Sequence, residues 1–220
     1  MKEHIPSPCY ILEENLLRRN LDLIKQVGDR AGVEIILAFK GFSMWSTFPV
    51  VKEYISGATA SSLNELRLCN EEMEAKSHAY FVAYKKEEFE YVLKGSSHIT
   101  FNSLNQYSAF KNEVNKNQDH VSFGLRVNPE YSEVTTDLYN PAAPTSRLGV
   151  TLANMPKELP EGISGLHFHV LCESDSFALE NTLNEFERKL SEYLKKVKWV
   201  NFGGGHLMTR KGYDTEHLIQ

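Results

Sequence analysis

Apolar residues along the chain alternate between two spacings, one typical of helices and one typical of buried strands. From Glu14 to about Gly28, leucine and isoleucine recur at helical spacing, as in an amphipathic helix. The next run, VEIILAFK from Val33 to Lys40, is nearly continuous and rich in β-branched residues. Runs of this kind are typical of parallel strands that are covered on both faces. The first unit is therefore predicted to be a helix followed by a buried strand.

The same alternation continues along the chain and predicts a parallel α/β fold. Further strand-like runs occupy residues 58–62, 78–84, 98–103, 121–128, 165–170 and 199–202. Helical patterns occupy residues 45–55, 63–73, 85–93, 104–115 and 176–197. A long irregular stretch with three prolines lies at residues 129–147. Seven strand candidates in regular alternation with helices predict right-handed crossovers and one parallel sheet.

Two architectures accommodate such units, a closed (β/α)8 barrel and an open doubly wound sheet. After Gly205 the sequence offers only the start of one more helix. Its 220 residues are also fewer than the roughly 250 of a typical (β/α)8 barrel. We therefore expect residues 1–220 to form a single incomplete barrel domain of the TIM type, truncated after the seventh strand.

Composition argues against several classes of partner. The formal net charge of −5 is unlike the basic surface that a nucleic-acid partner requires. No run approaches the eighteen or so apolar residues of a membrane span, and the N-terminal residues lack the apolar core of a secretion signal. Three widely spaced cysteines, Cys9, Cys69 and Cys172, form no CxxC motif. We therefore expect a cytoplasmic protein with no membrane partner.

Lys40 is the first candidate for chemistry because it ends the apolar run ILAFK. In β/α barrels the carboxyl ends of the strands face the active site. A lysine is costly to bury there as a cation, and a desolvated lysine amine is the group that forms Schiff bases with aldehydes. The alternative is a lysine whose amine simply reaches water at the end of a strand.

The second candidate is the triplet of glycines that follows the seventh predicted strand. Without side chains, the backbone amides of Gly203, Gly204 and Gly205 can approach a phosphate closely. The loops after strands seven and eight are also a recurrent phosphate site in barrels. The alternative is a flexible turn.

His167 and His169 form the third candidate. They stand two residues apart in a predicted strand, so both side chains point to the same face. A histidine at the end of that strand can stack on an aromatic cofactor, whereas the alternatives are core histidines or a metal pair. Zinc needs at least a third ligand, and because the neighbouring sequence offers none, no metal is expected.

Arg147 and Glu65 are weaker signals. An arginine after a long loop, such as Arg147 in TSRLGV, can contact an oxygen of a cofactor, and Glu65 lies in ASSLNEL. Surface salt bridges are the more frequent explanation for both residue types.

Together these motifs resemble the pyridoxal-phosphate (PLP)-dependent decarboxylases and racemases of the alanine-racemase-like barrel class. The segments AFK, ATASS-x-x-E, RVNP, SRLG, HFHVLCE and NFGGGH occur in the same order as in that class. Each motif is weak alone, but the ordered set spans nearly the whole chain. Within the class the combination resembles the carboxynorspermidine decarboxylases, because Leu171, Cys172 and Glu173 stand where other members have a turn rich in Gly or Ser.

The resemblance implies an alanine-racemase-type barrel that binds PLP. It implies that Lys40 holds the cofactor covalently and that His169 stacks on its pyridine ring. It assigns the phosphate to the amides of Gly203, Gly204 and Gly205.

The resemblance also implies that Arg147 contacts the region of the ring hydroxyl and that Glu65 supports the site beneath the cofactor. Many relatives carry an aspartate where this sequence has Thr59, so the sequence departs from the pattern of the class at that position.

The implied activity is decarboxylation of carboxynorspermidine or carboxyspermidine to norspermidine or spermidine, in polyamine biosynthesis. Members of the class also have a glutamate on an eighth strand and a C-terminal β-domain that completes the site in a homodimer. These parts would lie beyond Gln220, so we expect the 220-residue piece alone to be inactive. The alternatives are a diaminopimelate-type decarboxylase or racemase, a non-catalytic PLP-carrier barrel, and a barrel enzyme without PLP.

Overall fold

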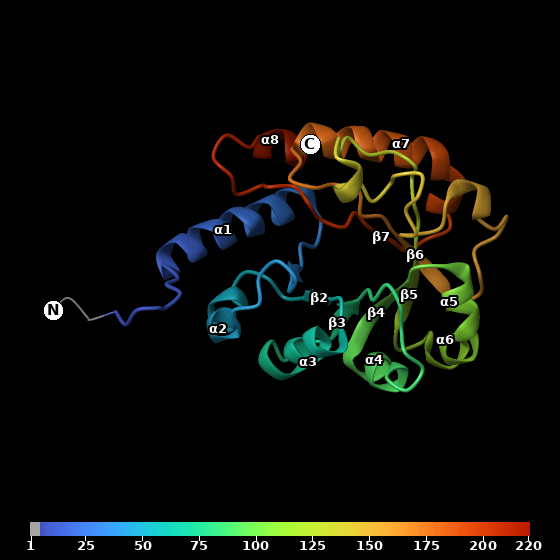
Figure 1. The fold of residues 1–220 in the computed structure, drawn as a ribbon, viewed down its shortest axis with the longest axis horizontal. Helices are drawn as coiled ribbons and strands as arrows, with labels where there is room; N and C mark the ends of the chain where they lie inside the picture. Colours follow the sequence, from blue (N-terminus) through green and yellow to red (C-terminus); the bar gives the residue numbers. More distant parts are fainter. Residues whose placement is uncertain (1–4) are drawn as a thin grey trace.

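The computed structural model describes residues 5–220 and places seven strands in one sheet (Figure 1). The strands follow one another in sequence order, and every neighbouring pair is parallel. Sequential parallel order is the arrangement of a β/α barrel, in which each crossover leads to the adjacent strand. The strands are β1 (Leu37–Ala38), β2 (Ala58–Ala60), β3 (Ser77–Ala79), β4 (Ser96–Phe101), β5 (Ser122–Arg126), β6 (Ile163–His167) and β7 (Trp199–Asn201).

Helices cover the outer side of the curved sheet (Figure 1). Polar side chains cap the first turn of several helices: Ser62, Ser103 and Asp175 each accept a hydrogen bond from the backbone N–H three residues later. The helices are α1 (Glu14–Ala31), α2 (Phe48–Val51), α3 (Leu63–Glu72), α4 (Phe89–Gly95), α5 (Leu104–Ala109), α6 (Lys111–Asn117), α7 (Ser176–Leu194) and α8 (Thr215–Ile219). Three short 3-10 turns lie at Trp45–Thr47, Asp137–Tyr139 and Leu152–Asn154.

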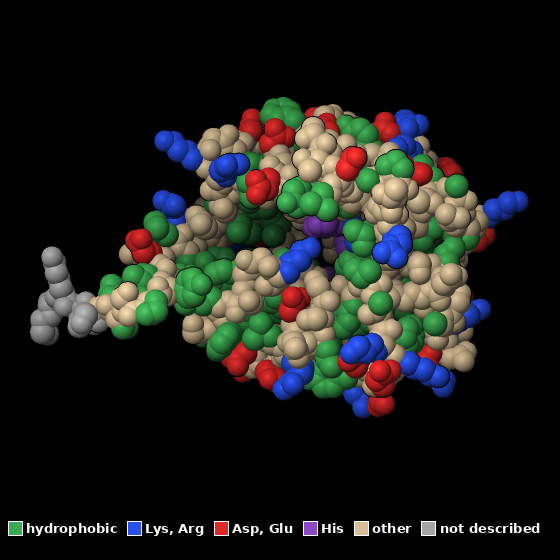
Figure 2. All heavy atoms as spheres, viewed as in Figure 1, with side chains coloured by type: hydrophobic (Ala, Val, Ile, Leu, Met, Phe, Trp, Pro, Cys, Tyr) green, Lys and Arg blue, Asp and Glu red, His purple; other side chains and the backbone are tan. Residues whose placement is uncertain are grey.

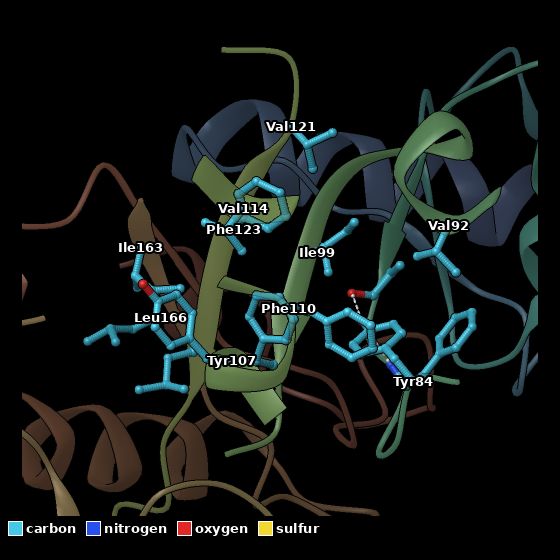
Figure 3. Close-up of a cluster of buried hydrophobic side chains, with 14 of the residues drawn as sticks. Tyr84, Val92, Ile99, Tyr107, Phe110, Val114, Val121, Phe123, Ile163 and Leu166 are labelled. Atoms are coloured by element: carbon cyan, nitrogen blue, oxygen red, sulfur yellow. Dashed lines mark hydrogen bonds between the residues drawn. The ribbon is translucent and has the colours of Figure 1, made fainter. Parts of the chain in front are cut away.

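The two faces of the sheet differ in chemistry because side chains alternate along each strand. The outer face is apolar, and its aromatic and aliphatic residues pack against the helices (Figure 3). Phe101 and Phe123 stack there with ring centroids 6.0 Å apart, and Phe89 lies 3.9 Å from Phe110. This buried layer holds the strands in register.

The inner face carries polar side chains and glycines. At the amino ends of the strands the Trp199 ring lies against Gly124 and Gly165, where an added Cβ would come within 2.3 and 1.9 Å of ring atoms. The indole N–H donates to Ser122 Oγ at 2.7 Å. These glycines are therefore required by the close approach of the tryptophan.

A seam separates the first and last strands, since among the described residues β1 pairs only with β2 and β7 only with β6. A cavity of about 490 Å³ lies along the seam, lined by α1, β7, α7, α8 and the residues that precede β1, together with His78 and His98. Helix α8 crosses it, and Glu216 binds Arg30 of α1 at 2.6 and 2.7 Å.

Several elements are shorter than the sequence pattern predicts. The run at 33–40 gives only two residues of strand, because β1 has a ladder partner on one side alone. The helix expected at 45–55 ends at Val51, and the one expected at 104–115 breaks at Phe110, which leaves the helical region with φ −118°. Within the described residues no helix combines the length and the apolar character needed to cross a bilayer.

Candidate active site

The carboxyl ends of the strands bring the main sequence-predicted residues to one end of the sheet. Lys40 follows β1, His169 follows β6 and Gly203 follows β7. Because all the strands are parallel, these three positions share an end of the fold. Figure 2 shows that the face viewed in Figure 1 is hollowed near its centre, with histidine side chains in the hollow.

Lys40 lies in a tight turn directly after β1. The N–H groups of Gly41 and Phe42 both donate to the carbonyl of Ala38, at 2.9 and 3.1 Å. The residue is exposed, yet the pKa of its amine is lowered, first by partial desolvation and then by the positive charge of Arg126. Glu65 opposes this shift. A lowered pKa increases the fraction of neutral, nucleophilic amine.

His169 links the sixth and seventh strand ends. Its Nδ1 accepts a hydrogen bond of 3.0 Å from the N–H of Gly204, so a neutral ring carries its proton on Nε2. Burial, together with the charges of Lys40 and Arg126, lowers the pKa of His169 to about 4. The imidazole is therefore neutral at physiological pH.

The glycine bend packs tightly against the segment that follows β6. Gly203 and Gly205 have φ of +70° and +107°. A Cβ at Gly203 would come within 2.6 Å of His169 Nδ1, and one at Gly205 within 2.2 Å of the carbonyl oxygen of Leu171. At Gly204, by contrast, an added Cβ meets nothing within 4 Å. Glycine is needed at the two outer positions for conformation and for space.

The amides of the bend are only partly used within the chain. The N–H of Gly203 donates to Asn201 Oδ1 at 2.7 Å, and the carbonyl of Gly205 accepts from the N–H of Ser174 at 2.9 Å. The Gly205 N–H has no acceptor among the described residues. The bend therefore retains a backbone donor for an anion.

Arg126, which the sequence analysis did not single out, lies at the centre of the site. It is the last residue of β5 and is 4% exposed. Its guanidinium donates to Tyr80 Oη at 2.5 Å and to the carbonyl of His169 at 3.0 Å. Among the described residues no carboxylate forms an ion pair with it. A buried cation of this kind favours an anionic ligand.

Glu65 and Arg147 occupy different surroundings. Glu65 Oε2 accepts from the N–H of Ser61 at 2.6 Å, next to the turn that begins α3, and its charge acts on Lys40. The Arg147 side chain is exposed, and the residue contributes its backbone carbonyl, which accepts from Asn102 Nδ2 at 2.9 Å. The charge of Glu65 opposes the lowering of the Lys40 pKa, and the predicted contact of the Arg147 side chain stays a prediction.

His167 lies deeper in the same face as His169. It is 6% exposed, its ring meets Tyr80 edge to face at 5.0 Å, and burial lowers its pKa well below the usual range. Its Nδ1 has no hydrogen-bond partner in the described part of the chain. Within the same residues, no three side chains of the His, Cys, Asp or Glu types are grouped as metal ligands.

Three curated decarboxylases are similar to the chain over nearly all its length. Carboxyaminopropylagmatine decarboxylase of Synechocystis sp. is 46% identical over 215 residues, which cover 98% of this chain and 55% of the relative. Carboxynorspermidine/carboxyspermidine decarboxylases of Campylobacter jejuni and Herminiimonas arsenicoxydans are 43% and 34% identical. The chain is a homologue of these decarboxylases. It spans about half of the length of the relatives it matches, and no protein-family model matches it.

Solved structures of such decarboxylases share the fold. Carboxynorspermidine decarboxylase from Campylobacter jejuni, crystallised with norspermidine, superposes with a TM-score of 0.88 at 40% identity, over 98% of this chain and 55% of that one. A diaminopimelate decarboxylase superposes with a TM-score of 0.71 at 18% identity, which shows the fold alone. The sheet is thus seven consecutive strands of the barrel found in these decarboxylases, as the sequence predicted.

Proposed function

We propose that this chain forms the cofactor-binding part of a PLP-dependent decarboxylase that acts on carboxynorspermidine or carboxyspermidine. The observation that carries the proposal is the connection between three strand ends. The charge of Lys40 acts on His169, and His169 Nδ1 holds the N–H of Gly204. An amine, an imidazole ring and a glycine bend therefore lie at the same end of the sheet.

The described residues fit PLP. Lys40 supplies an amine with a lowered pKa for its aldehyde, and Gly205 supplies a free backbone donor for its phosphate. The bend is closely packed at Gly203 and Gly205, which leaves backbone rather than side chains to face an anion. The positive charge of Arg126 favours the binding of anionic groups such as the substrate carboxylate.

When bound, PLP supplies an electron sink for the charge left as carbon dioxide departs. The residues of this chain would bind the cofactor and orient it. Lys40 would hold the cofactor through its amine, and as a free amine with a lowered pKa it would accept and return a proton at Nζ. His169 offers a neutral ring that Gly204 holds in one orientation. Arg126 keeps positive charge in a position sheltered from water.

The relatives favour a substrate that combines an amino-acid group with a polyamine chain. The curated names specify carboxynorspermidine and carboxyspermidine for two relatives, and norspermidine was bound in the solved structure. Carboxyaminopropylagmatine is a second candidate, because the relative named for it is 46% identical to this chain. Release of carbon dioxide from each of the three compounds, with diaminopimelate as the contrasting substrate, would discriminate among them.

The attachment of PLP is tested by Lys40→Ala in the full-length natural polypeptide that contains these residues. We expect the wild type with PLP to show the absorbance of the lysine-bound cofactor, and the variant to lose both this absorbance and essentially all turnover. The matched control is Lys94→Ala, which removes an exposed amine paired with Glu90 on α4.

Absence of the cofactor absorbance from the wild type would contradict the proposal. Binding of PLP without carbon dioxide release from any of the substrates would favour the carrier barrel instead.

A further inference from the structure

A chain of hydrogen bonds crosses the carboxyl ends of four strands beside Lys40. The Arg126 guanidinium, on β5, donates to the carbonyl of His169, beyond β6, at 3.0 Å. It also donates to the hydroxyl of Tyr80, which directly follows β3, at 2.5 Å. The Tyr80 hydroxyl in turn donates to Oδ1 of Asn102, which follows β4, at 2.8 Å. The path thus runs from His169 through Arg126 and Tyr80 to Asn102.

Asn102 connects this path to the loop that contains Arg147 and Gly149. Its Nδ2 donates to the carbonyl of Arg147 at 2.9 Å, and its Oδ1 also accepts from the N–H of Gly149 at 3.0 Å. Gly149 has φ +87°, and a Cβ there would come within 2.9 Å of the backbone of Val127. The loop therefore has little freedom to shift without disturbing Asn102.

The Tyr80 hydroxyl is the member of this path that cannot be replaced by an apolar group of similar shape. It accepts from a cation on one side and donates to an amide oxygen on the other, as a phenol can. Arg126 is 4% exposed and Asn102 is 8% exposed, so little water reaches the path to take over these bonds. The guanidinium also lies over the Tyr80 ring, 5.0 Å from its centroid.

Arg126 needs such restraint because its cationic neighbour repels it. The charges of Arg126 and Lys40 act on one another and on His169, and no carboxylate of the described chain pairs with Arg126. The acceptors that hold the guanidinium are the Tyr80 hydroxyl and the His169 carbonyl. Loss of the hydroxyl leaves the cation with one directional contact and freedom to move away from Lys40.

We propose that Tyr80 is a positioning residue, which holds the Arg126 guanidinium in place against Lys40 and His169 with Asn102 as its support. The inference rests on the proposed function for its effect on turnover. Its effect on the Lys40 amine is independent of any activity, because the charge of Arg126 acts on that amine directly.

The test is Tyr80→Phe in the full-length polypeptide, compared with Tyr107→Phe. Tyr107 is a buried tyrosine whose hydroxyl makes one contact, a donation to the carbonyl of Glu161 at 2.8 Å, and it lies in α5 on the outer face. We expect Tyr80→Phe to lower kcat about tenfold, as for one lost hydrogen bond to a charged group, with KM changed less than about twofold. Tyr107→Phe should leave both close to the wild-type values.

The second measurement is the reactivity of Lys40 without cofactor. The rate of acetylation of Lys40 by acetic anhydride, followed by mass spectrometry across pH, reports the pKa of the amine. In Tyr80→Phe we expect this pKa to move upward, because a displaced Arg126 disfavours the charged amine less. Asn102→Ala should give the same direction with a smaller change, since Tyr80 keeps its contact with Arg126.

The outcomes separate the two proposals. Wild-type protein without decarboxylase activity would remove the proposed function, while a shift of the Lys40 titration in Tyr80→Phe would still support the positioning role. If Tyr80→Phe matched Tyr107→Phe in both the Lys40 titration and turnover, the positioning role would be overturned.

Discussion

The inner face of the sheet holds a pair of histidines at each end, and the two ends use them differently. At the amino ends of the strands, the rings of His78 and His98 lie 3.9 Å apart, and Trp199 meets His98 edge to face at 5.3 Å. At the carboxyl ends, His169 accepts from the backbone of Gly204 and lies in the field of two cations. The first pair is packed among rings, whereas His169 is held by directional hydrogen bonds.

The difference teaches where this sheet tolerates charge. The amino end has close contacts between Trp199 and two glycines, which leave no room for a ligand beneath the ring. The carboxyl end holds Arg126 buried without an ion pair in the described chain and keeps Lys40 beside it. Packing stabilises one end, and the other end holds positive charges that an anionic ligand, as proposed, would stabilise.

The largest effect is expected where the packed end is overfilled. Gly165→Ala places a Cβ within 1.9 Å of the Trp199 ring, so the ring must move and the indole bond to Ser122 is disturbed. We expect the free energy of unfolding to fall by about 3 kcal/mol or more in urea denaturation, because ring atoms lie 1.9 Å from the new Cβ. Gly204→Ala is the matched control, because nothing lies within 4 Å of its added Cβ. Equal stability of the two variants would show that the amino end is not closely packed.

The next largest effect is on the pH dependence of stability, which we expect to arise from the histidine pair at the amino ends of the strands. Burial, with the neighbouring His98, lowers the pKa of His78 to about 4, whereas 6.5 is the ordinary value. The unfolded state therefore binds more protons between pH 6.5 and 4, so stability is fully present above pH 6.5 and falls as the pH drops through this window. In the wild type we expect this titration to lower the free energy of unfolding by on the order of 2–3 kcal/mol between pH 7 and pH 4. His78→Gln should abolish this part of the pH dependence, as measured by urea denaturation at each pH.

His98→Gln provides the comparison for the same titration. Burial also lowers the pKa of His98, but the charge of Glu34 opposes the shift. We therefore expect His98→Gln to flatten the dependence of stability on pH less than His78→Gln does. The opposite ranking would mean that the interaction with Glu34, rather than burial, dominates at this end.

The smallest effect is expected at hydroxyl groups of the packed end. Ser96 is fully buried, and its Oγ has no hydrogen-bond partner among the described residues. Ser96→Ala should leave stability unchanged or raise it by up to about 1 kcal/mol. Ser122→Ala should lower it by about 1 kcal/mol, because Ser122 Oγ accepts from the Trp199 indole at 2.7 Å. Thermal unfolding of the two variants tests this ranking. A loss of stability in Ser96→Ala would indicate that Ser96 Oγ has a hydrogen-bond partner.

The order and direction of the strands were predictable because the outer face is continuously apolar. The β-branched and aromatic runs around Ile99 and Phe123 identify strands without reference to their partners. The length of β1 was not predictable, since it depends on whether a second strand lies beside it. Likewise the break at Phe110 reflects tertiary packing, where its ring stacks on Phe89 at 3.9 Å.

The candidate site was predictable only in part. Lys40, His169 and the glycines stand at strand ends, where position alone suggests a site. Arg126 also ends a strand, but its burial depends on Tyr80 and His169, which lie 46 and 43 residues away along the chain. An arginine in a short motif does not reveal such partners.

Glu65 had a local signal that the sequence analysis did not use. Ser62 and Glu65 match the S-x-x-E pattern of a helix start, and Ser62 Oγ accepts from the Glu65 N–H at 3.2 Å. The pattern predicts where α3 begins and therefore where the Glu65 carboxylate lies relative to the strand end. Its electrostatic effect on Lys40 still required the fold.

The attachment of α8 determines how the two sides of the seam respond to salt. Toward α7, the ring of His217 stacks on Phe177 at 3.9 Å, and Leu218 packs on a buried cluster around Leu179. Toward α1, the link includes the exposed ion pair of Arg30 with Glu216, which mobile ions screen. Raising the ionic strength should therefore weaken the contact of α8 with α1 but not its contact with α7. At high salt α8 would move together with α7 rather than bridge the seam.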